Sequence, residues 1–286
     1  MATISSQTRL ARWMKLPLLG NWSLGGVAFV YLTLILIIPL GALVHDGLQG
    51  GLGVLWQSLT QSIVWHALLL TLWTAALAAG INAIMGLLTA YVLVRYEFPG
   101  KAILNAIVDL PLAIPTLITG VMFLVLLGPQ EPLGKWLGNV LHVQILFAPS
   151  AIVLVLLFVT FPFVVRAVQP VLEALDRDPE AAAATLGAGD WTIFRRVTLP
   201  ALSLPLISGT LLSFARSIGE FGAVVLVSGN IPFHTQTAAV YVLGEIESSD
   251  QLGASAISLV LLAVAFALTL VVDALQQRLQ RQGGAA

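Results

Sequence analysis

Six long apolar stretches, separated by short polar segments, dominate the pattern of hydrophobic and polar positions along the chain. Each stretch reaches the roughly 20 residues that a helix needs to cross a bilayer. The stretches run approximately over Leu24–Val44, Val64–Val94, Ile103–Leu127, Ile145–Val168, Ala201–Ser228 and Gly253–Leu275. The pattern therefore predicts an all-α, polytopic membrane protein with about six transmembrane helices.

The composition agrees with a lipid environment. Of the 286 residues, 58% are hydrophobic and 9% are charged, whereas soluble domains carry about 25% charged residues. The net charge of −1 gives no basic field that would indicate a nucleic-acid partner. The absence of cysteine excludes disulfides and thiolate metal sites.

The basic residues are distributed unevenly about the predicted membrane. One side holds eleven of the thirteen, namely Arg9, Arg12, Lys15, Arg95, Lys101, Arg166, Arg177, Arg195, Arg196, Arg278 and Arg281. Loops rich in Lys and Arg stay in the cytoplasm, so we expect both termini there. The chain then divides into a cytoplasmic segment over 1–23, a transmembrane domain over 24–275 with a long cytoplasmic loop at about 169–199, and a cytoplasmic tail over 276–286.

That long loop contains a short predicted helix. Asp178 is a good N-cap, Pro179 suits the first helical position, and alanines follow. Gly187 can adopt the left-handed conformation that stops a helix. We expect a second short helical stretch to begin at Asp190 and to end before Pro200. Helices this short are unstable alone, so this one must dock on its own bundle or on a partner.

Two charged residues, Arg216 and Glu220, lie inside the fifth apolar stretch. A charge at mid-bilayer is costly, so both should face the bundle interior or a wet cavity. They stand four residues apart and would share one helix face. Either they form a structural pair, or Arg216 attracts an oxyanion along a translocation pathway. Gly219 and Gly222 flank Glu220 and can loosen the helix where it lines a cavity.

Other polar residues within the apolar stretches have simpler interpretations. Asp109 is either a carboxylate near the membrane surface or part of the pathway, and Pro111 and Pro115 predict a kink just after it. We expect Asn82 to hydrogen-bond between helices and Arg166 to extend toward the lipid headgroups. The chain contains no P-loop motif, and its four scattered histidines predict no metal site.

The loop resembles the EAA loop of ABC-importer permeases, whose pattern is Glu-Ala-Ala, three residues, Gly, nine residues, then Ile-x-Leu-Pro. Residues 180–187 read Glu-Ala-Ala-Ala-Ala-Thr-Leu-Gly, and 197–200 read Val-Thr-Leu-Pro. Ala182, Ala183, Gly187, Leu199 and Pro200 match in register, and Val197 replaces the isoleucine. Glu180 stands one residue earlier than the family's glutamate, which would fall at position 181. Adjacent helical residues point about 100° apart, so this glutamate can make a different contact.

Four further segments, 95–100, 109–115, 162–173 and 213–225, are similar to sulfate/thiosulfate permease subunits, and residues 168–173 resemble the T-type more than the W-type. Related molybdate permeases share the Gly-Glu-Phe-Gly element. This resemblance implies the type I importer (MetI-like) permease fold. The residues it implicates are Glu180, Ala182, Ala183, Gly187, Val197, Leu199 and Pro200 in coupling, and Arg216, Gly219, Glu220, Gly222 and Asp109 along the pathway.

The resemblance also implies partners and a location. The expected partners are ABC ATPase subunits, a second permease (a W-type homologue or a second copy) and a periplasmic sulfate-binding protein. ATP and Mg²⁺ would bind to the ATPase subunits, so this chain is expected to hold no cofactor and to be no enzyme itself. The expected location is the bacterial inner membrane, with no nucleic-acid partner.

Two kinds of alternative remain at this point. The substrate could be molybdate or another tetrahedral oxyanion. An ion-coupled secondary transporter would explain the intramembrane charges, but it would not explain the capped, alanine-rich loop. An intramembrane enzyme would need a convergent catalytic set, and the sequence shows none.

Overall fold

The computed structural model describes residues 18–248 and 251–283, and regular structure in these ranges is helical. The first half contains α1 (Leu18–Leu32), a π-helical stretch (Thr33–Ile37), α2 (Ile38–Gln49), α3 (Gly51–Thr60), α4 (Ser62–Arg95), α5 (Lys101–Ala113), α6 (Thr116–Leu127), α7 (Pro132–Val140) and α8 (Pro149–Ala174). The second half contains α9 (Asp178–Thr185), α10 (Asp190–Ile193), a π-helical stretch (Phe194–Thr198), α11 (Leu199–Ala201), α12 (Ser203–Ile218), α13 (Gly222–Ser228), α14 (Ala238–Glu247) and α15 (Gln251–Gly283).

Membrane-length helices fall in three of the six predicted apolar stretches, and two bent helix pairs overlap two others. Within the described residues, three helices are long and apolar enough to cross a bilayer: Gly25–Gln49, α4 and α8. Two further segments are bent pairs, α5 with α6 at 111° and Asp190–Ala201 with α12 at 66°. The shorter apolar stretch Gly253–Ala267 lies within α15. The all-helical polytopic architecture predicted from the sequence is therefore confirmed.

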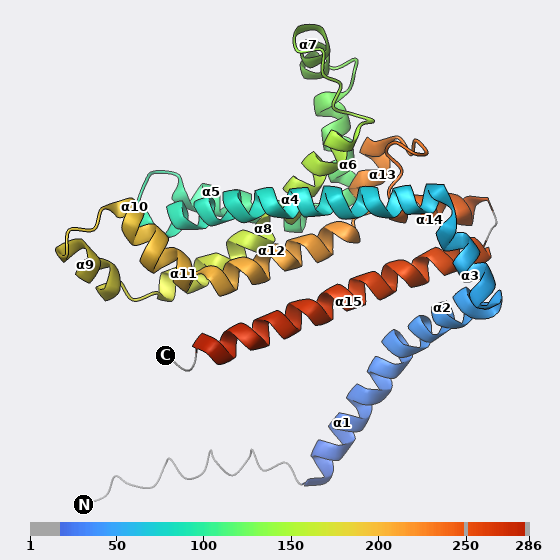
Figure 1. Ribbon diagram of the computed structural model, residues 1–286, viewed down its shortest axis with the longest axis horizontal. Helices are drawn as coiled ribbons and strands as arrows, with labels where there is room; N and C mark the ends of the chain where they lie inside the picture. Colours follow the sequence, from blue (N-terminus) through green and yellow to red (C-terminus); the bar gives the residue numbers. More distant parts are fainter. Residues whose placement is uncertain (1–17, 249–250, 284–286) are drawn as a thin grey trace, which may run out of the picture.

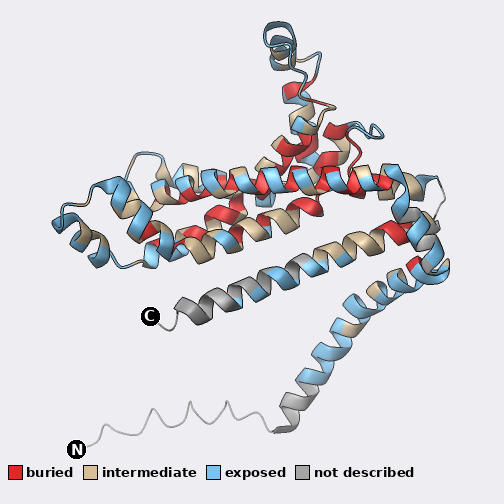
Figure 2. Cartoon of the chain, in the orientation of Figure 1, coloured by how far each residue is buried: buried red, intermediate tan, exposed pale blue. Residues whose placement is uncertain are grey.

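The centre of the bundle is formed by α4, α8 and α12, which lie side by side (Figure 1). Small residues allow the close approach: a side-chain carbon at Gly86 of α4 would lie 2.8 Å from Val164 of α8. One at Gly209 of α12 would lie 3.0 Å from the Cα atom of the same valine. Figure 2 shows that the buried residues concentrate along these helices. In a membrane, such close packing supplies much of the attraction between helices.

A buried polar network also joins these three helices. The side-chain amide of Asn82 donates to the Leu157 carbonyl at 3.2 Å and to Thr160 Oγ1 at 3.0 Å. Ser213 of α12 donates to the same threonine oxygen at 2.9 Å. The expectation that Asn82 hydrogen-bonds between helices is confirmed.

The third apolar stretch is two helices rather than one kinked helix. Pro115 forces Ile114 into an extended conformation with ψ 126°, because a residue before proline avoids helical geometry. The second half, α6, leaves the bundle direction and packs against α13 (Figure 1). Pro111, by contrast, is accommodated inside α5.

The fifth stretch is also discontinuous, which corrects the single span expected over Ala201–Ser228. Its first helix, α12, ends at Ile218, and the next, α13, begins at Gly222. The expectation that the glycines loosen the helix there is confirmed. Three short helices between the membrane segments, α3, α7 and α14, were not expected from the apolar pattern.

The first membrane segment stands apart from the bundle. The side chains of α2 and of the adjoining Gly25–Leu32 are mostly exposed (Figure 2), although α2 packs on α15. Residues 1–17 of the predicted cytoplasmic segment 1–23 lie outside the described residues. Residues 284–286 of the predicted tail 276–286 also lie outside them.

The packing of α12 on α8 generates a prediction about glycine. Gly209→Ala should destabilise the protein by about 1–3 kcal/mol, because the new methyl group meets the α8 backbone. Gly80→Ala on α4 is the matched control, since nothing lies within 4 Å of that position. Thermal unfolding in detergent should show a lower midpoint for Gly209→Ala only; equal midpoints would contradict the packing described.

Candidate functional site: a loop helix and a broken membrane helix

The loop helix α9 ends as its sequence predicts. Gly187 has φ +83°, and its N–H bonds the Ala184 carbonyl at 3.0 Å. The N–H of Ala188 reaches back to the Ala183 carbonyl at 3.1 Å. These two bonds form a Schellman motif, which requires a left-handed residue where glycine stands.

The start of α9 differs from the prediction in one detail. The helix begins at Asp178 itself, and its N–H is taken by the carboxylate of Asp176 at 3.0 Å. Asp176 therefore performs the capping that we assigned to Asp178. Pro179 lies in the first turn, as expected, since its missing N–H is not needed there.

Glu180 is bound to other residues of its own chain. Its Oε1 lies 2.6 Å from Nη2 of Arg95, the last residue of α4, and accepts a hydrogen bond from Thr198 Oγ1 at 2.7 Å. The arginine and glutamate side chains are 9% and 20% exposed. The carboxylate thus joins α4, α9 and the π-helical stretch before α11.

The opposite side of the loop is exposed and partly apolar. Ala182 is exposed and Ala183 is half-buried. Leu186 and Trp191 are 88% and 72% exposed. Trp191 stacks on Phe194, with ring centroids 5.7 Å apart. Exposed apolar side chains on a polar loop can contact a partner protein.

The second half of the loop packs on the bundle and does not stop where we expected. Leu199 packs against the core cluster around α8, and Val197 is half-buried. We predicted that the helical structure would end before Pro200. It continues instead, because Pro200 lies within α11. Proline is tolerated there because it lies in the first turn of α11.

Arg216 and Glu220 lie at the break between α12 and α13. Arg216 Nη2 is 2.7 Å from Glu220 Oε2, and the two side chains are 36% and 1% exposed. The contact is misaligned, so Oε2 has no hydrogen-bond donor in the described structure. Oε1 accepts the Ala223 N–H at 3.1 Å, which caps the start of α13. The carboxylate therefore stabilises the break on both sides.

The two broken segments meet at this point. A side-chain carbon at Gly222 would overlap Thr116 Oγ1, at the start of α6. One at Gly120 would lie 2.9 Å from the Ala223 carbonyl oxygen. Gly219, in contrast, is exposed, with only the Arg216 carbonyl oxygen nearby at 3.9 Å. The helix starts of α6 and α13 thus pack together, while Gly219 faces open space.

Asp109 belongs to a separate cluster. Arg166 of α8 binds both of its carboxylate oxygens at 2.6 Å. The same guanidinium also donates to the side chains of Asn105 and Gln169 and to the Asn105 carbonyl. The expectation that Arg166 extends to the headgroups is therefore wrong. No hydrogen bond or ion pair among the described residues joins this cluster to Arg216.

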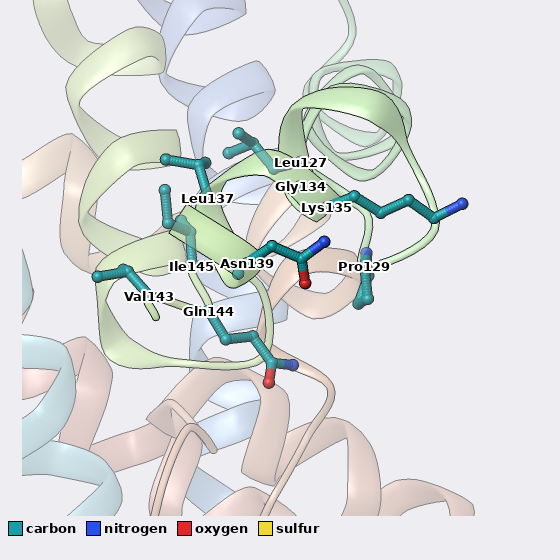
Figure 3. Close-up of a pocket in the computed structure, with 10 residues that line it drawn as sticks. Leu127, Pro129, Gly134, Lys135, Leu137, Asn139, Val143, Gln144 and Ile145 are labelled. Carbon is teal, nitrogen blue, oxygen red and sulfur yellow. The ribbon is translucent and has the colours of Figure 1, made fainter. Parts of the chain in front are cut away.

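A small cavity of about 150 Å³ lies beneath α7. Figure 3 shows Asn139 and Gln144 beside it, with the Lys135 side chain extending away. This cavity is remote in sequence from the loop and from the break. Among the described residues, no group of three or more His, Cys, Asp or Glu could hold a metal ion.

Sequence reasoning missed three contacts. Arg95 was assigned only to the basic side of the membrane, and Thr198 only to the loop motif. Nothing in their spacing from Glu180, at 85 and 18 residues, indicates a contact. The bidentate Asp109–Arg166 pair had one available signal, since two opposite charges fell in the cytoplasmic halves of neighbouring apolar segments.

Comparison with known proteins agrees with this architecture. Residues 82–282 match the family described as "Binding-protein-dependent transport system inner membrane component". The chain is 38% identical over 273 residues to a probable sulfate transport system permease protein cysT of Nephroselmis olivacea, covering 96% of this chain and 92% of that protein. It is 39% identical over 257 residues to the sulfate transport system permease protein CysT of Escherichia coli K12, covering 90% and 92%.

Solved structures show the same fold at low identity. A bacterial alginate ABC transporter, solved with an alginate-bound periplasmic protein, gives a TM-score of 0.77 at 16% identity, covering 91% of this chain and 94% of that chain. The MetNI methionine ABC transporter gives 0.54 at 15% identity, covering 75% and 93%. The expected importer-permease fold is confirmed. The chain therefore belongs to the family of binding-protein-dependent inner-membrane transport components, and it is a multi-pass ABC-transporter permease rather than the ATPase.

Proposed function

We propose that this chain is the sulfate permease subunit of an ATP-driven importer, with thiosulfate as a second substrate. Relatives at 38–39% identity over at least 90% of the chain carry the name of sulfate transport permeases. The structural observation on which the proposal rests is Arg216. It is a half-exposed cation at a helix break inside a membrane segment, where an anion needs compensation for its lost hydration.

The two intramembrane arginines differ in the donors that they leave available. Arg166 places five hydrogen bonds on Asp109, Asn105 and Gln169, so its guanidinium is saturated. Arg216 has one misaligned contact to Glu220 and no hydrogen bond to another described residue. Arg216 can therefore offer N–H groups to a passing oxyanion. Asp109 has a structural role in this scheme, and the earlier pathway hypothesis for it is not retained.

The loop 169–199 supplies the contact to the energy source. In this proposal α9 is a coupling helix that sits on an ABC ATPase subunit, which binds ATP and Mg²⁺. The exposed side chains of Leu186 and Trp191 support such a contact with the ATPase subunit. A helix of eight residues held on one side by its own bundle keeps the other side free for a partner.

The remaining partners and the topology follow from the same scheme. A periplasmic sulfate-binding protein delivers the anion, and a second permease, of W-type or a second copy, covers the broken segments, since lipid cannot satisfy them. Both termini are cytoplasmic. The described basic residues support this, because Arg95 ends α4 beside the loop that also holds Arg177, Arg195 and Arg196.

One prediction of this proposal tests coupling through Gly187. Gly187→Val should cost roughly 1–2 kcal/mol at φ +83°, because a β-branched residue is strained there. Binding-protein-stimulated ATP hydrolysis by the purified complex should fall several-fold. Gly189→Val is the matched control, since that glycine has an open environment but φ −74°. Equal rates of ATP hydrolysis with both variants would show that the loop takes no part in coupling.

A second prediction tests Arg216 as part of the anion path. The complex, reconstituted with its ATPase and binding-protein partners, should take up radiolabelled sulfate into vesicles when ATP is supplied. Arg216→Ala should reduce uptake about tenfold at normal abundance, and Arg216→Ala/Glu220→Ala should not recover it. Arg216→Lys, which keeps the charge, should retain part of the activity.

The double variant separates the two roles of the pair. Full uptake by Arg216→Ala/Glu220→Ala at normal abundance would show that the pair is only structural. Competition by thiosulfate and molybdate in the same assay identifies the anions that the complex accepts. Uptake of molybdate but not sulfate would overturn the proposed substrate.

A further inference from the structure

We propose that Glu180 is a positioning residue that ties the coupling helix α9 to the end of α4, and that it makes no contact with the ATPase subunit. This inference rests on the proposed function, because it concerns how the loop transmits the work of ATP hydrolysis. It assigns the loop's glutamate a partner within its own chain. The contact to the ATPase then belongs to the exposed side of the loop.

The geometry around the carboxylate supports this assignment. One oxygen of Glu180 receives both the Arg95 guanidinium, at 2.6 Å, and the Thr198 hydroxyl, at 2.7 Å. Charge-assisted bonds of this length are among the strongest in proteins. Solvent screens the pair weakly, because its side chains are only 9% and 20% exposed. The two bonds hold the carboxylate against its own chain, on the side of α9 that faces α4.

The register of the loop leads to the same conclusion. The EAA pattern places its glutamate at position 181, which is an exposed alanine in this chain. Glu180 stands one residue earlier, so its side chain is rotated about 100° around the helix. That rotation directs the carboxylate toward the bundle. The displaced glutamate is therefore a change of partner, not a weakened copy of the same contact.

The partner helix extends far from the loop. The 34 residues of α4 run without a break from Arg95 back to Ser62, a length of about 50 Å. Near its far end, Thr71 Oγ1 accepts the N–H of Ala238 at the start of α14 at 2.9 Å. A displacement of α9 is thus passed through one ion pair to a helix that reaches the opposite end of the bundle.

A ring contact steadies the junction. Tyr91, one turn before Arg95, meets Phe194 of the loop edge to face, with centroids 5.4 Å apart. Edge-to-face aromatic pairs prefer this geometry. The loop is therefore attached to α4 at two points, and the ion pair is the one that reaches α9.

The test exchanges the two charges. Glu180→Gln and Arg95→Gln should each lower the ratio of binding-protein-stimulated to basal ATP hydrolysis about tenfold, because each removes a charge-assisted bond. Arg95→Glu/Glu180→Arg, which restores an ion pair of reversed sense, should recover at least half of the ratio. The amount of co-purified ATPase should stay unchanged in all variants.

Two controls sharpen the result. Glu97 and Lys101 form an exposed pair of the same charges at 2.7 Å in the neighbouring loop, and Glu97→Gln should have no effect. Thr198→Val keeps the shape but removes the second donor to Glu180, and it should give a smaller loss. Arg95→Met, which removes the charge but keeps a long side chain, replaces Arg95→Gln if that variant does not assemble.

A second readout does not depend on transport. The chain has no cysteine, so a single cysteine at the half-buried Ala183 reports directly on α9. Maleimide should label it several-fold faster in the Glu180→Gln background than with Glu180 present, because α9 then loses its ion pair with Arg95. Unchanged labelling would overturn the proposed tie even if the wild-type complex showed no stimulated hydrolysis.

The outcomes distinguish the possible failures. A severe Glu180→Gln defect combined with a harmless Arg95→Gln change and no recovery by the charge exchange would place the carboxylate on the ATPase and overturn the inference. A wild-type complex whose ATP hydrolysis does not respond to the binding protein, but whose Ala183 cysteine responds to Glu180→Gln, would reject the proposed function and leave the tie standing.

Discussion

Backbone that leaves helical geometry inside a bilayer needs hydrogen-bond partners from the protein or from water, because lipid supplies none. This constraint governs the architecture of the permease, which breaks two of its membrane segments. At one break, the carboxylate of Glu220 takes the N–H of Ala223 and pairs with Arg216. At the other, α6 restarts after Pro115 with its first turn packed against Gly222. The two breaks pack against each other.

The same constraint explains why the permease holds its arginines so differently. A charged side chain with a purely structural role is most stable when all of its N–H donors are bonded. Arg166 meets this condition through a bidentate bond to Asp109 and three further hydrogen bonds. Arg216 carries a single misaligned contact in a half-exposed position. In the proposed function, these unused donors are available to a dehydrated anion, whereas the saturated Arg166 has a structural role.

At the loop, the chain solves a different problem, which is to hold a short helix in place without closing its outer surface. The Schellman motif ends α9 at Gly187, and Glu180 fixes its inner side to α4. Leu186 and Trp191 remain exposed on the loop. A rigid inner attachment with a free outer surface suits an element that must transmit force between subunits.

The sequence predicted what depends on local chemistry and on apolar length. It located the membrane segments, the glycine stop at Gly187, the interhelical bond of Asn82 and the loosened helix near Gly219. It could not predict contacts between residues far apart, such as Arg95 with Glu180, because spacing along the chain holds no information about them. It also underestimated Pro115: a proline predicts a kink, but the 111° turn arises because α6 gains packing against α13.

The central claim is that the break beside Arg216 faces a water-filled anion path rather than lipid. Gly219 offers a direct test, since it is exposed, has room for a side chain and lies in a chain without cysteine. The measurement is the reaction rate of Gly219→Cys with a negatively charged, membrane-impermeant thiosulfonate reagent in the assembled complex. We predict a rapid reaction that sulfate slows, with the buried Ala223→Cys unreactive. A Gly219→Cys variant that reacts only with lipid-soluble reagents would contradict the account.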